Sequence, residues 1–174
     1  MKKFQDKVVW ITGSSSGIGE ATAYEFAKEG AKLILTALEA DLLQQVCKKC
    51  EELGSPKAEA LPFDLSQKDQ VAELAEKAWN VFGYIDVFYN NAGISQRSKT
   101  IDTEMKVINK VMDINYFAPV IMTKVILPKM VERGGGQLVV TTSINGRFGF
   151  PLRCAYSSSK HALYGFFSSV VELP

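Results

Sequence analysis

Near its N-terminus the 174-residue sequence reads Lys7-Val8-Val9-Trp10-Ile11-Thr12-Gly13-Ser14-Ser15-Ser16-Gly17-Ile18-Gly19. The part before Gly13 is mostly apolar and too short for a helix, which is typical of a strand buried on both faces of a parallel sheet. A helical pattern then covers Glu20 to Glu29. This order favours a phosphate site, because free N–H groups and the positive end of the helix dipole face an anion. A flexible turn is the alternative, since Gly-x-x-x-Gly-x-Gly differs from the common dinucleotide-binding fingerprint.

The alternation of strands and helices continues along the chain. Further strands are expected over residues 32–37, 58–63, 85–89 and 137–142. Helices are expected to end near Leu53, to cover about 67–82, and to cover about 105–133 with an interruption or kink near Pro119 and Pro128. The alternation predicts an α/β fold with a doubly wound parallel sheet, in a single domain over residues 1–174.

Residues after the second and third strands bear on cofactor choice. The absence of an acid at Ala37 weakens the case for NAD, and the absence of a basic residue at Leu38 weakens the case for NADP. Glu39 is either a ribose ligand or the first-turn acid of the next helix, and we favour the second interpretation. Asp64 is either an adenine contact or, like Ser66, a helix cap.

Polar residues also follow the fourth and fifth strands. Asn90-Asn91-Ala92-Gly93 ends the fourth strand on the side of the sheet where ligands bind, although a plain turn explains it equally. Asn115 lies within an apolar helical segment, so it marks either a structural link or a functional water. Ser143 follows the fifth strand. The apolar loop over residues 144–155 either lines a substrate cavity or covers the helix that follows.

Tyr156-Ser157-Ser158-Ser159-Lys160 places a phenol and an ammonium on one face of a helix. A neighbouring cation favours the phenolate and lowers the pKa of a tyrosine, whose ordinary value is about 10. Such a phenol can exchange a proton with an alcohol or carbonyl oxygen. The alternative is the start of an ordinary amphipathic helix. The single histidine, His161, points about 100° away from Lys160 on the helix and is interpreted as structural.

The composition excludes several classes of protein. A net charge of +1 gives no electrostatic reason to expect nucleic acid or an anionic membrane surface. We find no signal-length apolar segment and no run long enough to span a bilayer, so the cytoplasm is the expected location. Cys47 and Cys50 lie in a helical pattern without a second pair of ligands, so no metal site is expected. Three cysteines do not make a disulfide framework.

These motifs together resemble the short-chain dehydrogenase/reductase family. The similarity covers essentially the whole chain and rests on six motifs in register, namely Thr12-Gly13-x-x-x-Gly17-x-Gly19, Asp64, Asn90-Asn91-Ala92-Gly93, Asn115, Ser143 and Tyr156-x-x-x-Lys160. It implies a Rossmann-like, three-layer α/β/α fold with strand order 3-2-1-4-5. Residues 91–98 and 159–163 also resemble the branch of the family that acts on lipid-like or other bulky carbonyl compounds.

The resemblance implies a NAD(P)-dependent oxidoreductase that transfers a hydride between a nicotinamide and a carbonyl or secondary alcohol, with a slight preference for NADP. Tyr156 would be the general acid or base, Lys160 would lower its pKa and hold the nicotinamide ribose, and Ser143 would hydrogen-bond the substrate oxygen. Asn115 would hold a water that connects Lys160 to solvent. The cofactor-binding residues would be Gly13, Ser15, Ser16, Gly17, Ile18, Gly19, Asp64, Leu65, Asn91, Ala92, Gly93, Tyr156 and Lys160.

The chain departs from the family at its C-terminus. Family members continue through two more strands and a substrate-covering segment, whereas this sequence stops at Pro174. The fifth strand is then expected to be an edge with exposed apolar surface, and the family's packing implies a homodimer or homotetramer. A module that binds the cofactor without turnover is therefore an alternative to an enzyme. An unrelated Rossmann protein, such as a methyl transferase, is a third possibility, although it has no use for the proton donor.

Overall fold

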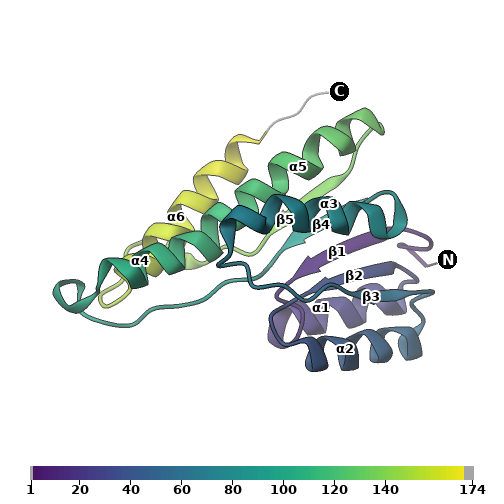
Figure 1. Cartoon of the computed structure of the whole chain (residues 1–174), viewed down its shortest axis with the longest axis horizontal. Helices are drawn as coiled ribbons and strands as arrows, with labels where there is room; N and C mark the ends of the chain where they lie inside the picture. The colour runs from purple at the N-terminus through teal and green to yellow at the C-terminus, as the bar shows by residue number, and fades with distance from the viewer. Residues whose placement is uncertain (1, 171–174) are drawn as a thin grey trace.

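The computed structural model describes residues 2–170 and contains one parallel sheet. Its strand order is β3-β2-β1-β4-β5, which confirms the order expected from the family resemblance (Figure 1). The strands are β1 (Val8–Thr12), β2 (Lys32–Thr36), β3 (Ala58–Ala60), β4 (Val87–Asn90) and β5 (Gln137–Val140). Because all pairings are parallel, the carboxyl ends of the central strands meet at one edge of the sheet.

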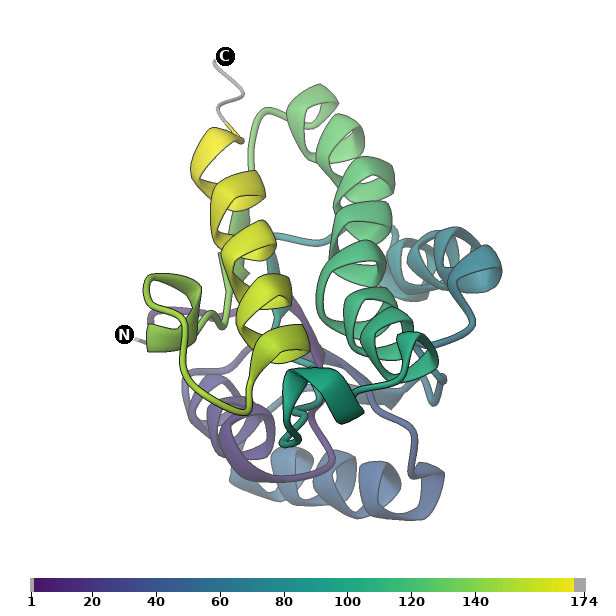
Figure 2. The same cartoon turned by 90° about the vertical axis from the view of Figure 1, so that its left-hand side faces the viewer.

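Helices cover both faces of the sheet (Figures 1 and 2). The α-helices are α1 (Gly17–Lys28), α2 (Ala40–Leu53), α3 (Val71–Phe82), α4 (Met105–Met112), α5 (Ala118–Glu132) and α6 (Cys154–Ser169). Helices α1 and α2 pack together on one face, and α3 packs beside α5 on the other. Helix α6 lies alongside α4 and the π-helical segment Asp113–Phe117, so the expected Tyr156 helix is docked on the rest of the fold.

Two hydrophobic cores form because successive strand residues point to opposite faces. Trp10 and Phe88 stack at 4.2 Å on the face covered by α3 and α5. Val9 and Ile11 pack against α1 and α2 on the other face. Every residue of β1 is buried, which explains why this strand reads as a continuous apolar run rather than an alternating one.

The long helical region departs from the prediction in one respect. The sequence predicts an interruption near Pro119 or Pro128, but the regular α-helix is broken by a π-helical segment over Asp113–Phe117. Pro119 lies in the first turn of α5, where its missing N–H is tolerated, and Pro128 lies inside that helix. The π segment is centred on Asn115, whose side chain is engaged by other parts of the chain as described below. Short π segments of this kind often mark functional sites.

The sequence-based expectation that no segment could cross a bilayer is not met by this region. The helical stretch Met105–Glu132 is 28 residues long and is apolar enough to cross a membrane by length and composition alone. However, Ile114, Met122 and Ile126 from this stretch pack in the core against β1 and β4. An apolar helix that covers a sheet can pass the same test, and 44% of the most apolar window of this stretch is buried inside the fold.

The two cysteines of the Cys-x-x-Cys sequence are buried on α2 against the sheet. Burial raises the pKa of Cys47 to about 11 and that of Cys50 to about 12. Both therefore remain protonated thiols at neutral pH, a form that packs as a small apolar group and is a poor nucleophile.

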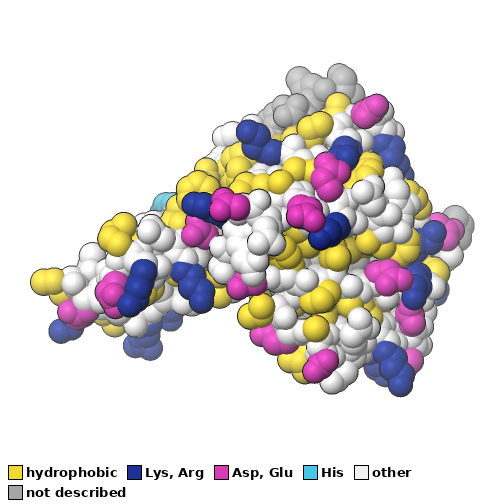
Figure 3. All heavy atoms as spheres, viewed as in Figure 1, with side chains coloured by type: hydrophobic (Ala, Val, Ile, Leu, Met, Phe, Trp, Pro, Cys, Tyr) yellow, Lys and Arg dark blue, Asp and Glu magenta, His cyan; other side chains and the backbone are white. Residues whose placement is uncertain are grey.

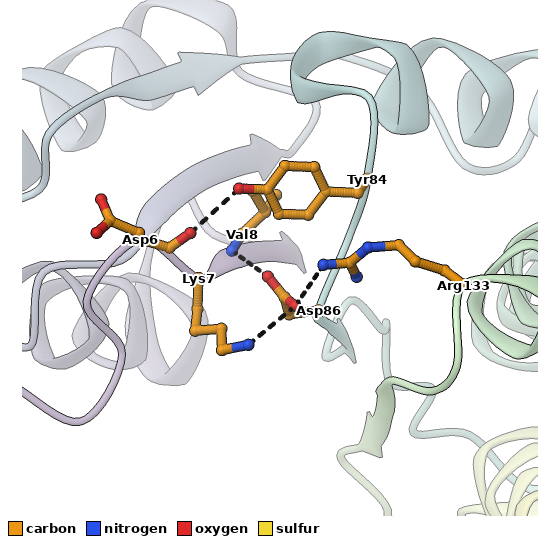
Figure 4. Close-up of polar contacts among 6 residues, drawn as sticks. All are labelled: Asp6, Lys7, Val8, Tyr84, Asp86 and Arg133. Atoms are coloured by element: carbon orange, nitrogen blue, oxygen red, sulfur yellow. Dashed lines mark hydrogen bonds and ion pairs between the residues drawn. The ribbon is translucent and has the colours of Figure 1, made fainter.

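Asp86, at the amino end of β4, ties three elements together (Figure 4). Its carboxylate accepts the backbone N–H of Val8 at 2.9 Å and lies 3.1 Å from the Arg133 guanidinium and 3.3 Å from the Lys7 ammonium. Burial opposes ionisation, but the hydrogen bond from Val8 and the charge of Arg133 outweigh it and hold the pKa of Asp86 below its ordinary value. The cluster thereby fixes β1 and the end of α5 against β4.

We expect Asp86→Asn to lower the free energy of unfolding by about 1–2 kcal/mol at pH 7, because a charge-assisted hydrogen bond is lost in a partly buried place. The folded-state pKa is depressed, so this stabilisation is present above the unfolded pKa of about 3.9 and is lost as the pH falls through the lower folded value. Urea unfolding at pH 7 and pH 3 measures it. The exposed Glu132→Gln is the control, and an equal loss at both pH values would contradict the assignment.

Candidate active site

A cleft of about 470 Å³ opens at the carboxyl ends of the strands. It extends from the glycine-rich turn after β1 to the first turns of α6. Its lining consists of Gly13, Ser15, Ser16, Ile18, Ala37, Leu38, Glu39, Phe63, Asp64, Leu65, Asn91, Ala92, Gly93, Ile94, Ser95, Ile114, Thr141, Thr142, Tyr156 and Lys160. The cleft therefore brings together residues from both ends of the chain. Of the thirteen predicted cofactor-binding residues, all but Gly17 and Gly19 lie in its wall.

The three glycines of the turn are required for different structural reasons. A Cβ on Gly19 would lie 2.1 Å from the carbonyl oxygen of Gly13, and a Cβ on Gly13 would lie 2.7 Å from the Cα of Ala92. These two glycines let the turn pack tightly under the loop after β4. Gly17 has a left-handed φ of +59° with no atom within 4 Å of its Cβ position, so the backbone at the start of α1 is open. The first N–H groups of a helix have no intrahelical partner, and here they begin at that open backbone.

Asn91 holds the turn and the loop after β4 together. Its side-chain amide donates to the carbonyl oxygens of Thr12 and Gly13 at 3.2 and 3.1 Å. The Thr12 hydroxyl accepts the backbone N–H groups of Asn91 and Ala92 in return. Asn91 and Ala92 therefore shape the cleft wall at its centre. Asn90 is buried instead, and its side-chain amide has no hydrogen-bond partner among residues 2–170.

Lys160 is a buried cation in the wall of the cleft. It is only 3% exposed, and its Nζ donates to the carbonyl oxygen of Thr141 at 2.8 Å. The same Nζ lies 5.9 Å from the ring centroid of Tyr156, so the predicted pair does share one face of α6. Burial lowers the pKa of Lys160 to about 8 because desolvation disfavours the charged form.

Asn115 is a structural link through its side chain. Its Oδ1 accepts the N–H of Ile94 at 2.8 Å, and its Nδ2 donates to the Ile94 carbonyl at 2.8 Å and to the Ser159 hydroxyl at 3.0 Å. It is fully buried and does not line the cleft. Asn115 thus joins the π segment, the loop after β4 and α6. Of the two roles that the sequence left open, the side-chain contacts favour the link.

Ser143 lies at the start of a short 3-10 helix over Ile144–Gly146. Its hydroxyl oxygen accepts the N–H of Asn145 at 3.2 Å, which leaves the hydroxyl proton free to donate. Ser143 is half-buried and stands directly after the cleft residues Thr141 and Thr142, but it is not itself in the cleft wall. Its predicted meeting with Tyr156 at a substrate oxygen therefore stays a prediction.

Two carboxylates, those of Asp64 and Glu39, line the end of the cleft opposite Tyr156 and Lys160. Asp64 accepts the N–H of Ser66 at 2.9 Å, so it caps a turn as well as facing the cleft, and that hydrogen bond lowers its pKa. Glu39 is the residue before α2, and its carboxylate accepts the Ser15 hydroxyl at 3.0 Å. The sequence leaves Glu39 as either a ribose ligand or a first-turn acid, and we favour the second interpretation from the sequence alone. Glu39 stands one residue before α2, whose first-turn acid is Asp41, and it lines the cleft three residues after the end of β2.

Comparison with known proteins identifies the family. Residues 7–172 match the family described as short chain dehydrogenase. The chain belongs to this family. Dehydrogenase/reductase SDR family member 7 from Homo sapiens is 42% identical over 168 residues, which are 95% of this chain and 50% of the relative. The similarly named protein from Drosophila melanogaster is 40% identical over 94% of this chain and 51% of its own length. This short-chain dehydrogenase sequence thus spans about half the length of its curated relatives.

Solved structures of the family agree with the fold. A short-chain dehydrogenase/reductase from Burkholderia phymatum, in complex with NAD, superposes with a TM-score of 0.89 at 27% identity, covering 98% of this chain and 60% of that one. Levodione reductase superposes with a TM-score of 0.88 at 33% identity, covering 94% and 64%. The family is one of oxidoreductases with a Rossmann-type nucleotide-binding fold.

Proposed function

We propose that this chain carries the cofactor site and the proton-transfer groups of an NAD(P)-dependent oxidoreductase that interconverts a carbonyl compound and a secondary alcohol. The observation that carries the proposal is that one cleft is lined both by the glycine-rich turn and by the Tyr156–Lys160 pair. The open helix start at the glycine-rich turn lies at one end, and Tyr156 and Lys160 lie at the other. The complex of a family member with NAD supports the choice of ligand.

The cleft residues fit a dinucleotide. The Ser15 and Ser16 side chains and the open start of α1 offer donors to a pyrophosphate. Asp64 and Leu65 would hold the adenine, and Asn91, Ala92 and Gly93 would form the wall toward the nicotinamide, since all five line the cleft. When bound, the nicotinamide supplies or accepts the hydride.

The protein groups then handle the proton. In reduction the Tyr156 hydroxyl gives its proton to the substrate oxygen as negative charge develops there, and in oxidation it takes that proton back. Lys160 lies on the same face of α6 as Tyr156, and its ammonium donates to the Thr141 carbonyl. It supplies positive charge beside the phenol. The Ser143 hydroxyl, whose oxygen accepts the Asn145 N–H, can donate its own hydrogen as a second hydrogen bond to the substrate oxygen.

The test is titration of NADH and NADPH into the purified chain, followed by addition of a panel of ketones and aldehydes. Substrate-dependent loss of the nicotinamide absorbance supports the proposed reaction. Binding without turnover favours a cofactor-binding module. Failure to bind either nucleotide would overturn the proposal.

We further propose that NAD, rather than the NADP slightly preferred from the sequence, is the better ligand. The cleft wall contains two carboxylates, Glu39 and Asp64, and its one basic residue, Lys160, comes from α6 at the opposite end. Glu39 follows β2, which is where the family's fold places the ribose hydroxyls. A 2′-phosphate there would be repelled, whereas ribose hydroxyls would donate to the carboxylate.

We therefore expect NADH to bind about tenfold or more tightly than NADPH, since one unfavourable charge contact of about 1.4 kcal/mol has that effect. Glu39→Gln should reduce this ratio by weakening the repulsion, and Glu39→Arg should reverse it. Fluorescence titration of both nucleotides measures the ratio. The exposed Glu104→Gln, which lies outside the cleft wall, is the charge-matched control. An unchanged ratio in both Glu39 variants would refute the role of this carboxylate.

A further inference from the structure

The sequence Ser95-Gln96-Arg97-Ser98 contains a buried glutamine that the proposed reaction does not use. Gln96 is 6% exposed, although its neighbour Arg97 is exposed. A buried amide in a loop needs partners, because desolvation without hydrogen bonds is costly. One partner of Gln96, the carbonyl oxygen of Leu152, lies in the loop that leads into α6, more than fifty residues further along the chain.

Gln96 bridges two loops through one nitrogen. Its Nε2 lies 2.7 Å from the Ser98 hydroxyl and 3.3 Å from the Leu152 carbonyl oxygen. The Thr103 hydroxyl and the Ser98 carbonyl also lie at 3.3 Å, so two hydrogens are shared among four oxygens. Because the Leu152 carbonyl can only accept, the amide nitrogen and not the oxygen has to face it. The amide oxygen of Gln96 has no partner among the described residues.

The residue that Gln96 holds has a strained backbone. Leu152 has a φ of +65°, in the left-handed region that side chains other than glycine rarely adopt. Its carbonyl also accepts the N–H of Ser98 at 3.1 Å. A strained residue persists only where its surroundings over-determine it. Here the surroundings are the two hydrogen bonds from the 96–98 segment.

The Leu152 turn determines where α6 begins. Arg153 follows it and precedes the first residue of the helix, and its carbonyl accepts the N–H of Ser157 at 2.7 Å. Its guanidinium turns back to the Ser95 hydroxyl and to the Gln96 carbonyl, the latter at 3.1 Å. Tyr156 lies only three residues after Arg153. Ser95 lies in the wall of the cleft. Figure 1 shows both loops in the lobe that projects beyond the sheet beside α4, and Figure 3 shows hydrophobic side chains at the tip of that lobe.

We propose that Gln96 is a positioning residue: it holds Leu152 in the left-handed turn and so fixes the first turn of α6, with Tyr156, against the cleft wall at Ser95. Two short segments, residues 95–98 and 152–153, thus connect Ser95 in the cleft wall to the helix turn that carries Tyr156. This inference rests on the proposed function for its effect on turnover, but its effect on α6 is independent of turnover.

The principal test is Gln96→Leu, which keeps the size of the side chain and removes its donor. We expect kcat for carbonyl reduction to fall about tenfold, because small misplacements of a reacting group have effects of this order or larger, while the KM for NADH changes less than about twofold. Amide hydrogen exchange of Ser157, followed by NMR in the protein without cofactor, should become about tenfold faster as the helix start loosens.

Three further variants separate positioning from general destabilisation. Arg97→Ala changes the exposed neighbour in the same loop and should leave both readouts unchanged. Ser55→Ala removes a buried hydroxyl that donates to the Ala31 carbonyl at 2.6 Å, far from the cleft, and should lower stability without altering kcat or Ser157 exchange. Adding Leu152→Gly to Gln96→Leu should recover part of kcat, because glycine adopts the left-handed turn without strain.

The outcomes separate the positioning role from the proposed function. If the wild-type chain binds NADH but reduces no carbonyl compound, the chain acts as a cofactor-binding module without turnover, and Ser157 exchange still decides the role of Gln96. Wild-type exchange and wild-type kcat in Gln96→Leu would overturn the positioning role. The same changes in Ser55→Ala would also overturn it, since they would then follow from lost stability alone.

Discussion

Tyr156→Phe is expected to bind NADH as the unmodified chain does and to lose carbonyl reduction by about a thousandfold. The substitution removes one oxygen, the proposed proton donor, and leaves the ring that lines the cleft. General acid catalysis contributes about 10²- to 10⁴-fold, which sets the expected loss. Because the ring packing is retained, the free energy of unfolding should change little. The measurement is kcat with saturating NADH and ketone, beside a fluorescence titration of NADH.

The matched control for this variant is Tyr164→Phe. Tyr164 lies two turns further along α6, outside the cleft wall, with its ring 3.8 Å from the Arg147 guanidinium. Removing its hydroxyl should leave turnover intact. If Tyr156→Phe kept more than about a tenth of the wild-type kcat, an effect far below that of a lost general acid, then another group would have to protonate the substrate oxygen.

The fold was predictable from the sequence because its signals are local and repeated. Val8, Val9, Trp10 and Ile11 form a short apolar run that is typical of a parallel strand covered on both faces, and similar runs recur between helical patterns. The strand order itself came from the family resemblance and not from these patterns. The π segment over Asp113–Phe117 was not predicted, because it depends on Asn115 reaching Ile94 and Ser159, which lie 21 and 44 residues away in sequence.

Site residues were predictable from the sequence where the end of a strand fixes their position. They were less predictable where contacts with residues distant in sequence determine the direction of the side chain. Asn91 and Asp64 follow strands, and both line the cleft. Glu39 also follows a strand, but its entry into the cleft depends on the Ser15 hydroxyl from another turn. Gln96 gave no signal of burial, since its partners include a carbonyl oxygen 56 residues away. Long-range polar pairing of this kind leaves no periodic pattern in a sequence.

Lys160→Met is expected to abolish most turnover while changing stability in a pH-dependent way. Activity should fall about a hundredfold or more, because the positive charge beside Tyr156 and the proposed ribose ligand are both removed. Stability responds to two opposing effects. The variant avoids burying an ammonium, whereas the Thr141 carbonyl loses the donor that lies 2.8 Å from it, at a cost of about 1–3 kcal/mol.

The pH dependence separates these two effects. Burial lowers the pKa of Lys160 from 10.5 to about 8 in the folded protein, so between these values the unfolded chain binds more protons than the folded one. The free energy of unfolding of the wild type should therefore rise with pH in this window, by about 2 kcal/mol between pH 8 and pH 10. Lys160→Met lacks this rise, because methionine does not titrate. The stability of the wild type relative to the variant should thus be lowest below pH 8 and should increase above it.

Urea unfolding of both proteins without cofactor, at intervals from pH 7 to pH 10, gives the difference directly. Lys48→Met, which changes an exposed lysine on α2, controls for the loss of a positive charge and should show no such slope. A difference between wild type and Lys160→Met that stayed constant with pH would mean that the ammonium is not desolvated in the empty cleft. Lys160 would then keep its positive charge beside Tyr156 without lowering the free energy of unfolding of the protein.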